Sequence, residues 1–415
     1  MKVFNQKIAY FSTYPPRECG IATYCQDLMW AINEHDQSAG IVIAINNGEK
    51  YNYPPEVKFT IDQSTLSDYK KAALWVNKSD IDLVMLQFEF GILGSRDHDG
   101  EYILEFLRNV KKPVVTTYHT VLSGTNTERM KTVNKTCDLS VGTIVMLPLA
   151  KKYLTYIYDA DPKKITIIHH GVPDIGRLES TAIVKEELGF QNRIVLSTFG
   201  LVNTGKGIEF VIQALPKIKE QYPNILFLVL GQTHPQIKKR DGEAYREFLE
   251  SEVRRLGLEK NVIFVNKYLS KEEIIKYLRS TDIYITSYLE PQQITSGALA
   301  YAIGAGRPII STRYIYAKQM ITKDRGLLVD FKNSEDMAKK VNQMLADPVS
   351  MKKMAAKNYQ LGRQMVWSAV AKRHLRLMRR ILYQPSLLEQ VLWHKPKQIV
   401  SKISKVNRIL DISKK

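Results

Sequence analysis

Two short polar segments, each following an apolar run, contain residue types that can hold a phosphate group. In one of them, Thr295, Ser296 and Gly297 begin a run of small residues that predicts a helix ending before Pro308. A hydroxyl there can cap the helix, and Gly297 lets a ligand approach backbone N–H groups at the positive end of the helix dipole. The segment predicts an anion site, with a phosphate or diphosphate as the first candidate. A small-residue helix packed tightly on a sheet would have the same composition.

The other segment is FGLVNTGKGIEF, residues 199–210. Its loop contains Gly200, Asn203, Thr204, Gly205, Lys206 and Gly207, in that order. The spacing differs from that of a Walker A loop, which needs a serine or threonine after the lysine. A lysine just inside a helix N-terminus can nevertheless neutralise a phosphate as a mobile point charge. The alternative is an ordinary turn with a solvated lysine.

The chain around these segments alternates apolar strands with helices, which is the pattern of a parallel, doubly wound sheet. One such series runs from residue 8 to about residue 170, and a second begins at residue 194. We therefore expect an α/β protein of two facing Rossmann-like domains, with parallel sheets and a deep cleft between the domains. In such sheets ligands bind beyond the carboxyl ends of the strands. His119 stands at such an end, although a histidine there is often structural.

The length is too great for one ordinary core. We expect an N-terminal Rossmann-like domain at 1–175, a linker at 176–192 and a C-terminal Rossmann-like domain at 193–365. Residues 366–384 are expected to form a helix that crosses back to the N-terminal domain, followed by a basic tail at 385–415.

The composition indicates a globular chain that is basic mainly at one end. The hydrophobic fraction is 44%, and the three cysteines show no CxxC spacing, which favours a reducing compartment and argues against a disulfide framework or a zinc site. No apolar run has the length of a signal peptide or a membrane-spanning helix, so a cytoplasmic protein is expected. The net charge is +18, and residues 372–415 contain twelve Lys and Arg against two acidic residues. This distribution weighs against nucleic acid as a partner.

The tail has the pattern of an amphipathic helix. Ile399, Ile403, Val406 and Leu410 recur among lysines in KQIVSKISKVNRILDISKK. Such a helix could lie on an anionic membrane surface and make the protein peripheral on the inner face of the membrane. Packing against the N-terminal domain or a partner subunit is the alternative.

Together these segments resemble the GT-B glycosyltransferases, and among them the retaining family 4 enzymes that use nucleotide sugars. The resemblance covers residues 7 to about 383. It is carried by the CGIA turn around Gly20, by TTYHT with His119, by GLVNTGKG with Lys206 and by AIGAGRP before the last strands. The segments YPPRECGIAT, QFEFGI and TTYHTV are similar to those of a bacterial subgroup of that family. The resemblance implies the GT-B fold and a nucleoside-diphosphate-sugar donor.

This chain departs from the family at two positions. The family segment G-R-L-x-x-x-K-G has an arginine where this chain has Leu201. The family's E-x7-E motif lacks its second glutamate: counting back from AIGAGRP places Gln293 and Tyr301 at the two positions, and starting from Glu290 places Ala298 at the second. A tyrosine can form one hydrogen bond to a ribose hydroxyl, but not the bidentate contact of a carboxylate.

From the resemblance we expect His119, Lys206 and Glu290 to be catalytic. The donor-binding residues would be Gly20, Gly200, Asn203, Thr204, Gly205, Lys206, Gln293, Thr295, Ser296, Gly297 and Tyr301. The residues that orient the sugar or the acceptor would be Arg17, Glu89 and His119. Lys206 and the N–H groups of residues 295–297 would stabilise the charge that develops on the leaving diphosphate.

The expected reaction moves a hexose, mannose or glucose, from a sugar nucleotide of the GDP-mannose or UDP-glucose type to a hydroxyl of a saccharide or lipid-linked acceptor. Configuration would be retained, and polysaccharide biosynthesis is the expected context. We expect no cofactor beyond this substrate and no metal, because no DxD-type carboxylate pair stands in a suitable loop. The alternative is a catalytically degenerate GT-B protein that binds a nucleotide sugar or a partner subunit.

Overall fold

The computed structural model describes residues 6–36, 40–94, 99–124, 127–176 and 181–383. Their contacts divide the chain into two compact units. Of the described residues, the first unit comprises those up to His170 together with Trp367–Tyr383, and the second comprises those of Gly171–Val366.

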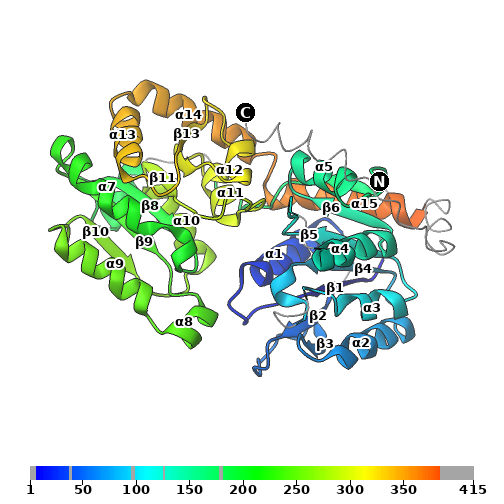
Figure 1. Ribbon diagram of the computed structural model, residues 1–415. Coiled ribbons are helices and arrows are strands. Elements are labelled where there is room, and N and C mark those ends of the chain that lie inside the picture. Colours follow the sequence, from blue (N-terminus) through cyan, green and yellow to red (C-terminus); the bar gives the residue numbers. More distant parts are fainter. Residues whose placement is uncertain (1–5, 37–39, 95–98, 125–126, 177–180, 384–415) are drawn as a thin grey trace. The chain divides into compact units, whose positions relative to one another are not determined.

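Among the described residues, the first unit contains a seven-stranded sheet whose neighbouring strands are parallel, in the order β3-β2-β1-β4-β5-β6-β7 (Figure 1). The strands are β1 (Ile8–Ser12), β2 (Ile41–Asn46), β3 (Val57–Asp62), β4 (Leu83–Phe88), β5 (Val114–Tyr118), β6 (Gly142–Val145) and β7 (Ile165–Ile167). The helices are α1 (Gly20–His35), α2 (Leu66–Lys78), α3 (Ile103–Asn109), α4 (Thr127–Leu139), α5 (Pro148–Tyr156) and α15 (Trp367–Tyr383), with a 3-10 turn η1 at Phe90–Ile92. The strand order reverses between β1 and β4, so the loops that follow these strands flank the usual ligand crevice of an open α/β sheet.

Helix α15 completes the core of the first unit, although its sequence lies far from the rest of that unit. Its apolar residues Val370 and Met378 are fully buried in one cluster with Leu28 and Ile32 of α1 and with alternate residues of the sheet. The charged residues of α15 occupy the other positions of the helical repeat, as expected for a helix with one apolar face.

The second unit, within the part of the chain that the structure describes, contains a six-stranded parallel sheet in the order β10-β9-β8-β11-β12-β13. The strands are β8 (Ile194–Phe199), β9 (Ile225–Leu230), β10 (Val262–Val265), β11 (Ile283–Thr286), β12 (Ile309–Thr312) and β13 (Gly326–Val329). The helices are α6 (Thr181–Glu187), α7 (Ile208–Gln221), α8 (Pro235–Asp241), α9 (Ala244–Arg255), α10 (Lys271–Ser280), α11 (Gly297–Gly304), α12 (Ile315–Met320), α13 (Ser334–Leu345) and α14 (Pro348–Gly362), with a 3-10 turn η3 at Thr204–Lys206. Here the order reverses between β8 and β11.

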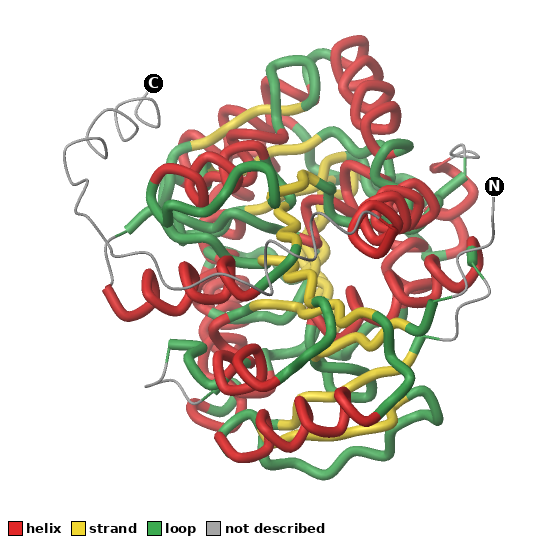
Figure 2. The backbone as a smooth tube through the Cα atoms, turned by 90° about the vertical axis from the view of Figure 1, so that its right-hand side faces the viewer, coloured by secondary structure: helices red, strands yellow, loops and turns green. Residues whose placement is uncertain are grey.

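Both faces of the second sheet are covered by apolar side chains. Leu196 and Phe227 lie in a cluster with residues of α7 and α13, whereas Val195 and Leu226 lie in a second cluster with residues of α10. Because successive residues of a strand point to opposite faces, these two clusters occupy the two faces of the sheet. Figure 2 accordingly shows helices flanking the strands. The near-continuous apolar strands of the sequence are those of a sheet buried on both sides.

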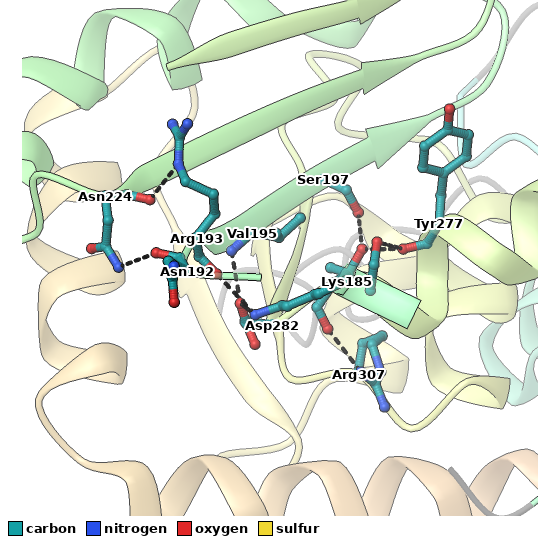
Figure 3. A network of polar contacts seen from close by, with 11 residues as sticks. Lys185, Asn192, Arg193, Val195, Ser197, Asn224, Tyr277, Asp282 and Arg307 are labelled. Atoms are coloured by element: carbon teal, nitrogen blue, oxygen red, sulfur yellow. Dashed lines mark hydrogen bonds and ion pairs between the residues drawn. The ribbon is translucent and has the colours of Figure 1, made fainter. Parts of the chain in front are cut away.

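A polar network ties β8 to β11 near their amino ends (Figure 3). Asp282, just before β11, accepts hydrogen bonds from the backbone N–H of Val195 (2.7 Å) and from Nζ of Lys185 (2.5 Å). The hydroxyls of Ser197 and Thr281 lie 2.8 Å apart. These contacts fix β8 and β11 relative to each other at their amino ends. The loops after the carboxyl ends of the same strands lie at the switch point, where the strand order reverses.

Lys185 belongs to α6, which lies inside the range 176–192 that the sequence predicted as a linker. The structure assigns this helix to the second unit and connects it to the sheet through Asp282. No residue of α6 is buried. Its sequence therefore shows no apolar stripe from which the helix could be predicted.

Among the described residues, no helix combines the length and the apolarity needed to cross a membrane. The amphipathic helix predicted in the tail lies outside the described residues.

Candidate functional site

The loop at residues 200–207, here called the glycine loop, follows β8 and lies against the segment that follows β11. Gly200 and Gly207 have positive φ angles of 128° and 58°. A Cβ on Gly207 would lie 2.4 Å from the carbonyl oxygen of Ser287, so a side chain at this position would collide with the backbone. The Ser287 hydroxyl also donates to the carbonyl of Lys206 (2.8 Å). The two strand ends at the switch point are thus held together.

The side chain of Lys206 is directed over the glycine loop. Its ammonium nitrogen lies 3.9 Å from the centre of the Tyr288 ring, and a Cβ on Gly200 would be 3.6 Å from the same nitrogen. The Tyr288 ring stacks on Tyr314 at 5.3 Å. The Tyr314 hydroxyl donates to Oγ1 of Thr286 (3.3 Å) and also lies near the hydroxyl of Ser296. A chain of side-chain contacts therefore connects the ammonium with the residue that begins α11.

Ser296 is the N-cap of α11, since its Oγ accepts a hydrogen bond from the backbone N–H of Leu299 (3.2 Å). Gly297 is the first helical residue, and Thr295 precedes the cap. The N–H groups of a first helical turn have no acceptor within the helix and carry the positive end of its dipole. The start of α11 and Lys206 thus provide two sources of positive potential beyond neighbouring strands.

Tyr301, on α11, stands next to the glycine loop. Its ring centre lies 6.0 Å from that of Phe199, the last residue of β8, and 8% of Tyr301 is exposed. The position that the resemblance aligns with a ribose-binding glutamate is therefore adjacent to Gly200.

Asn203 stabilises the glycine loop itself. Its Oδ1 accepts from the backbone N–H of Gly205 (2.9 Å), and its Nδ2 donates to the carbonyl of Leu201 (3.1 Å). Thr204 and Gly205 are exposed at the tip of the loop. Of the predicted loop residues, Asn203 maintains the turn, whereas Thr204 and Gly205 are accessible to a ligand.

Glu290 and Gln293 likewise bond within their own loop. Glu290 is exposed, and its carboxylate accepts from the backbone N–H of Gln292 (2.9 Å). Gln293 donates its side-chain N–H to the carbonyl of Thr295 (3.0 Å). These bonds shape the approach to α11.

In the first unit, His119 follows β5 and is almost fully buried, with 7% exposed. Its Nε2 lies 2.9 Å from Oε1 of Gln87, and its ring meets the ring of Tyr24 edge-on at 4.8 Å. Burial, together with the nearby His170, lowers the pKa of His119 to about 3. The imidazole is therefore neutral at physiological pH, and it can exchange hydrogen bonds with a sugar without carrying charge.

Glu89 follows β4 and lies beside the same strand end. Its Oε2 accepts from the hydroxyl of Thr120 (2.5 Å), the residue after His119. Desolvation raises the pKa of the Glu89 carboxyl above its ordinary value, against the opposing effect of the Thr120 hydrogen bond. The structure thus brings Glu89 and His119 to adjacent strand ends.

Arg17 and Gly20 lie in the loop and helix start that follow β1. The Arg17 guanidinium donates to the carbonyl of Ile45 in β2 (2.8 Å) and to Oε1 of Gln63 (3.0 Å), so it links β2 to the loop after β3. Gly20 is the first residue of α1, and a Cβ added to it would have no atom within 4 Å. Its surroundings leave room for a ligand near the helix N-terminus.

Sequence reasoning missed Tyr288 and Tyr24, which contact Lys206 and His119 respectively. Neither tyrosine falls in a pattern with a known ligand. A lysine and a histidine beyond strand ends can be expected to contact other side chains. Spacing along the sequence does not show which side chains these are.

Comparisons with known proteins show what the chain is similar to. Residues 180–361 match the family model described as "Glycosyl transferases group 1". An uncharacterised glycosyltransferase of Methanocaldococcus jannaschii is 26% identical over 205 residues, 48% of this chain and 49% of that protein. A D-inositol 3-phosphate glycosyltransferase of Nocardioides is 24% identical over 241 residues, 55% of this chain and 51% of that protein. The chain thus spans about half the length of the curated relatives it matches.

Solved structures match over nearly the whole chain. Anabaena HepE in complex with UDP superposes with a TM-score of 0.70 at 14% identity, covering 90% of this chain and 99% of that one. Sucrose-phosphate synthase from Thermosynechococcus elongatus gives a TM-score of 0.72 at 19% identity, covering 91% and 99%. At such identities the likeness concerns the fold. The predicted pair of Rossmann-like α/β domains with parallel sheets, as in GT-B glycosyltransferases, is confirmed.

Proposed function

We propose that the protein is a retaining glycosyltransferase that moves a hexose, mannose or glucose, from a nucleoside-diphosphate sugar to a hydroxyl of a saccharide or lipid-linked acceptor. The observation that carries the proposal is the position of Lys206 over the glycine loop, linked through Tyr288 and Tyr314 to the start of α11. A diphosphate is the ligand that this arrangement fits. The match to the group 1 glycosyltransferase model, which includes both segments, supports it.

In the proposed reaction, the bond between the anomeric carbon and the diphosphate oxygen breaks as the acceptor oxygen bonds to that carbon from the same face. The acceptor proton passes to the departing diphosphate. Negative charge grows on the diphosphate, and Lys206 and the N–H groups around Ser296 and Gly297 stabilise it. These groups are already placed before the reaction, so little reorganisation is needed.

The remaining predicted residues are assigned to recognition. Tyr301 would form one hydrogen bond to the ribose, and the Glu290 loop would frame the donor sugar. His119 and Glu89 would orient sugar and acceptor hydroxyls, since positioning contributes to rate by lowering the entropy lost in reaching the transition state. The neutral state of His119 suits hydrogen bonding to hydroxyls.

The donor is proposed to be of the UDP-glucose or GDP-mannose type. HepE was solved with UDP, and the glycosyltransferase domain model covers the glycine loop and α11. The test is to incubate the protein with UDP-glucose, GDP-mannose and an adenine counterpart, with saccharide acceptors, and to measure release of free nucleoside diphosphate. The anomeric configuration of the product is read by NMR. Release with a retained anomer supports the proposal, whereas inversion contradicts the mechanism.

A degenerate binding protein is the second candidate, because Leu201 and Tyr301 occupy positions at which the resembling family has charged groups. It predicts nucleotide binding without release of diphosphate from any donor in the panel. The same assay, combined with a binding measurement, separates the two candidates.

A peripheral position on the inner face of the membrane is proposed for residues 385–415, from their sequence pattern alone. Co-sedimentation with anionic vesicles, with and without these residues, tests it. Equal sedimentation of the two proteins contradicts membrane binding through the tail.

A further inference from the structure

Gln87 is a polar neighbour of the His119 ring, and it comes from the adjacent strand. It is the penultimate residue of β4 and is completely buried. Strands β4 and β5 pair in parallel, and the backbone N–H of His119 donates to the carbonyl of Phe88 (3.0 Å). The two side chains are thereby brought together, with Oε1 of Gln87 2.9 Å from Nε2 of His119.

This contact determines where the imidazole proton resides. The Gln87 carboxamide is placed with its oxygen toward the ring. In that orientation Nε2 of His119 is the donor, because a carboxamide oxygen can only accept a hydrogen bond. A neutral imidazole carries a single N–H, and its other nitrogen, Nδ1, is then left as an acceptor. The edge of the Tyr24 ring, at 4.8 Å, limits rotation of the imidazole.

The other half of the Gln87 carboxamide indicates that the residue is present for more than packing. Its Nε2 is buried and has no hydrogen-bond partner within the part of the chain that the structure describes. A buried donor without an acceptor costs stability, and an apolar residue of similar size would avoid that cost. The contact between the Gln87 carboxamide oxygen and His119 explains why a glutamine, and not an apolar residue, occupies this position.

We propose that Gln87 is a positioning residue that keeps the His119 proton on Nε2 and so presents Nδ1 as a hydrogen-bond acceptor to a sugar hydroxyl. The role of His119 at the sugar rests on the proposed function. The tautomer itself does not, and it can be measured on the protein alone.

The first test is NMR on protein labelled with 15N-histidine, with the His119 ring signals assigned by their absence in His119→Gln. The expected result is a neutral ring with the proton on Nε2 in the wild type, and a mixture of tautomers in Gln87→Leu. Thr117→Val is the matched control, because Thr117 is the β5 partner of Gln87 in register and its buried hydroxyl also has no partner among the described residues. It should leave the His119 signals unchanged. A wild-type ring with the proton on Nδ1 overturns the proposal.

The second test uses any donor that the wild type turns over. Gln87→Leu should lower kcat tenfold or more with a smaller change in KM, while Thr117→Val keeps wild-type kcat. In Gln87→Glu, a carboxylate facing Nε2 favours the imidazolium, so the acidic limb of the pH–kcat profile should move to higher pH. An unchanged kcat in Gln87→Leu, or an unmoved limb in Gln87→Glu, contradicts the positioning role. Absence of turnover by the wild type contradicts the proposed function instead, and the NMR test still decides the tautomer.

Discussion

The ammonium of Lys206 lies 3.9 Å from the centre of the Tyr288 ring, which places a cation from the loop after β8 against an aromatic side chain from the segment after β11. A cation over a tyrosine ring is attracted to the negative face of the ring. Tyr288 is 2% exposed and stacks on Tyr314, so the ring is a rigid support. The lysine is thereby held over the glycine loop before any ligand arrives.

Replacement of Lys206 by alanine is expected to lower kcat/KM by about a hundredfold or more, because one preorganised charge facing the leaving diphosphate is lost. Lys206 is partly exposed, and the melting temperature should change little. Lys219→Ala, at a partly exposed position of α7, is the matched control and should keep wild-type kinetics. Wild-type turnover in Lys206→Ala would refute the role given to this residue.

Gly207→Ala is expected to destabilise the protein strongly. Its φ of 58° disfavours a side chain, and the added Cβ would meet the Ser287 carbonyl at 2.4 Å. Gly257→Ala provides a matched control, since Gly257 has a φ of 60° and no atom within 4 Å of its Cβ position. The control should cost about 1 kcal/mol from backbone conformation alone. Chemical denaturation of both variants measures the difference; equal losses would show that the close approach to Ser287 is unimportant.

The sequence predicted the parallel α/β architecture because it depends on local patterns, and the prediction that two segments bind an anion rests on local patterns as well. Fully apolar strands indicate sheets buried on two sides, and glycine with lysine or serine after a strand indicates a phosphate-binding turn. It did not predict β3, α6 or the two helices α8 and α9 within a charged stretch. Neither α6 nor α8 has a buried residue, so neither shows an apolar stripe.

The sequence also did not show which residues that are far apart along the chain contact each other. Gln87 and His119 are brought together by β4–β5 pairing, and Lys206 and Tyr288 by the adjacency of β8 and β11. Asn203 and Gln293, predicted to bind the donor, and Glu290, predicted to be catalytic, were chosen for their polar groups, but the structure shows those groups bonded within their own loops. Spacing along the chain does not reveal whether a polar group already has a partner.

Ser296→Ala should lower the free energy of unfolding by about 1 kcal/mol, because the N–H of Leu299 loses its acceptor. Ser296→Thr keeps an acceptor oxygen and should lose less. Thr295→Ala is the neighbouring control, since Ser296 and not Thr295 caps the helix. Thermal and urea denaturation check the order, which a greater loss in Thr295→Ala than in Ser296→Ala would contradict.

Stability should fall on acidification, in part through His374. Its Nδ1 donates to the carbonyl of Val370 (2.9 Å), its Nε2 is buried, and burial lowers its pKa to about 4. The folded pKa is below the unfolded value of about 6.5, so the unfolded chain binds more protons between these values and unfolding is favoured as pH falls through this range.

His374→Leu should therefore lose about 2 kcal/mol less than the wild type when the pH is lowered from 7 to 5. His35→Gln, at an exposed position of α1, is the control and should follow the wild type. The free energy of unfolding from urea titrations at both pH values is the measurement. A pH dependence that His374→Leu leaves unchanged would show that this histidine does not couple folding to protonation.

The central claim is that the glycine loop and the start of α11 hold a diphosphate. Isothermal titration of the wild type and of Lys206→Ala with UDP, GDP and the corresponding nucleosides tests it most directly. The claim predicts that at least one diphosphate binds the wild type more than tenfold tighter than its nucleoside, and that Lys206→Ala loses most of this difference while Lys219→Ala retains it. Equal affinity for nucleoside and diphosphate in the wild type, or an undiminished preference in Lys206→Ala, would contradict it.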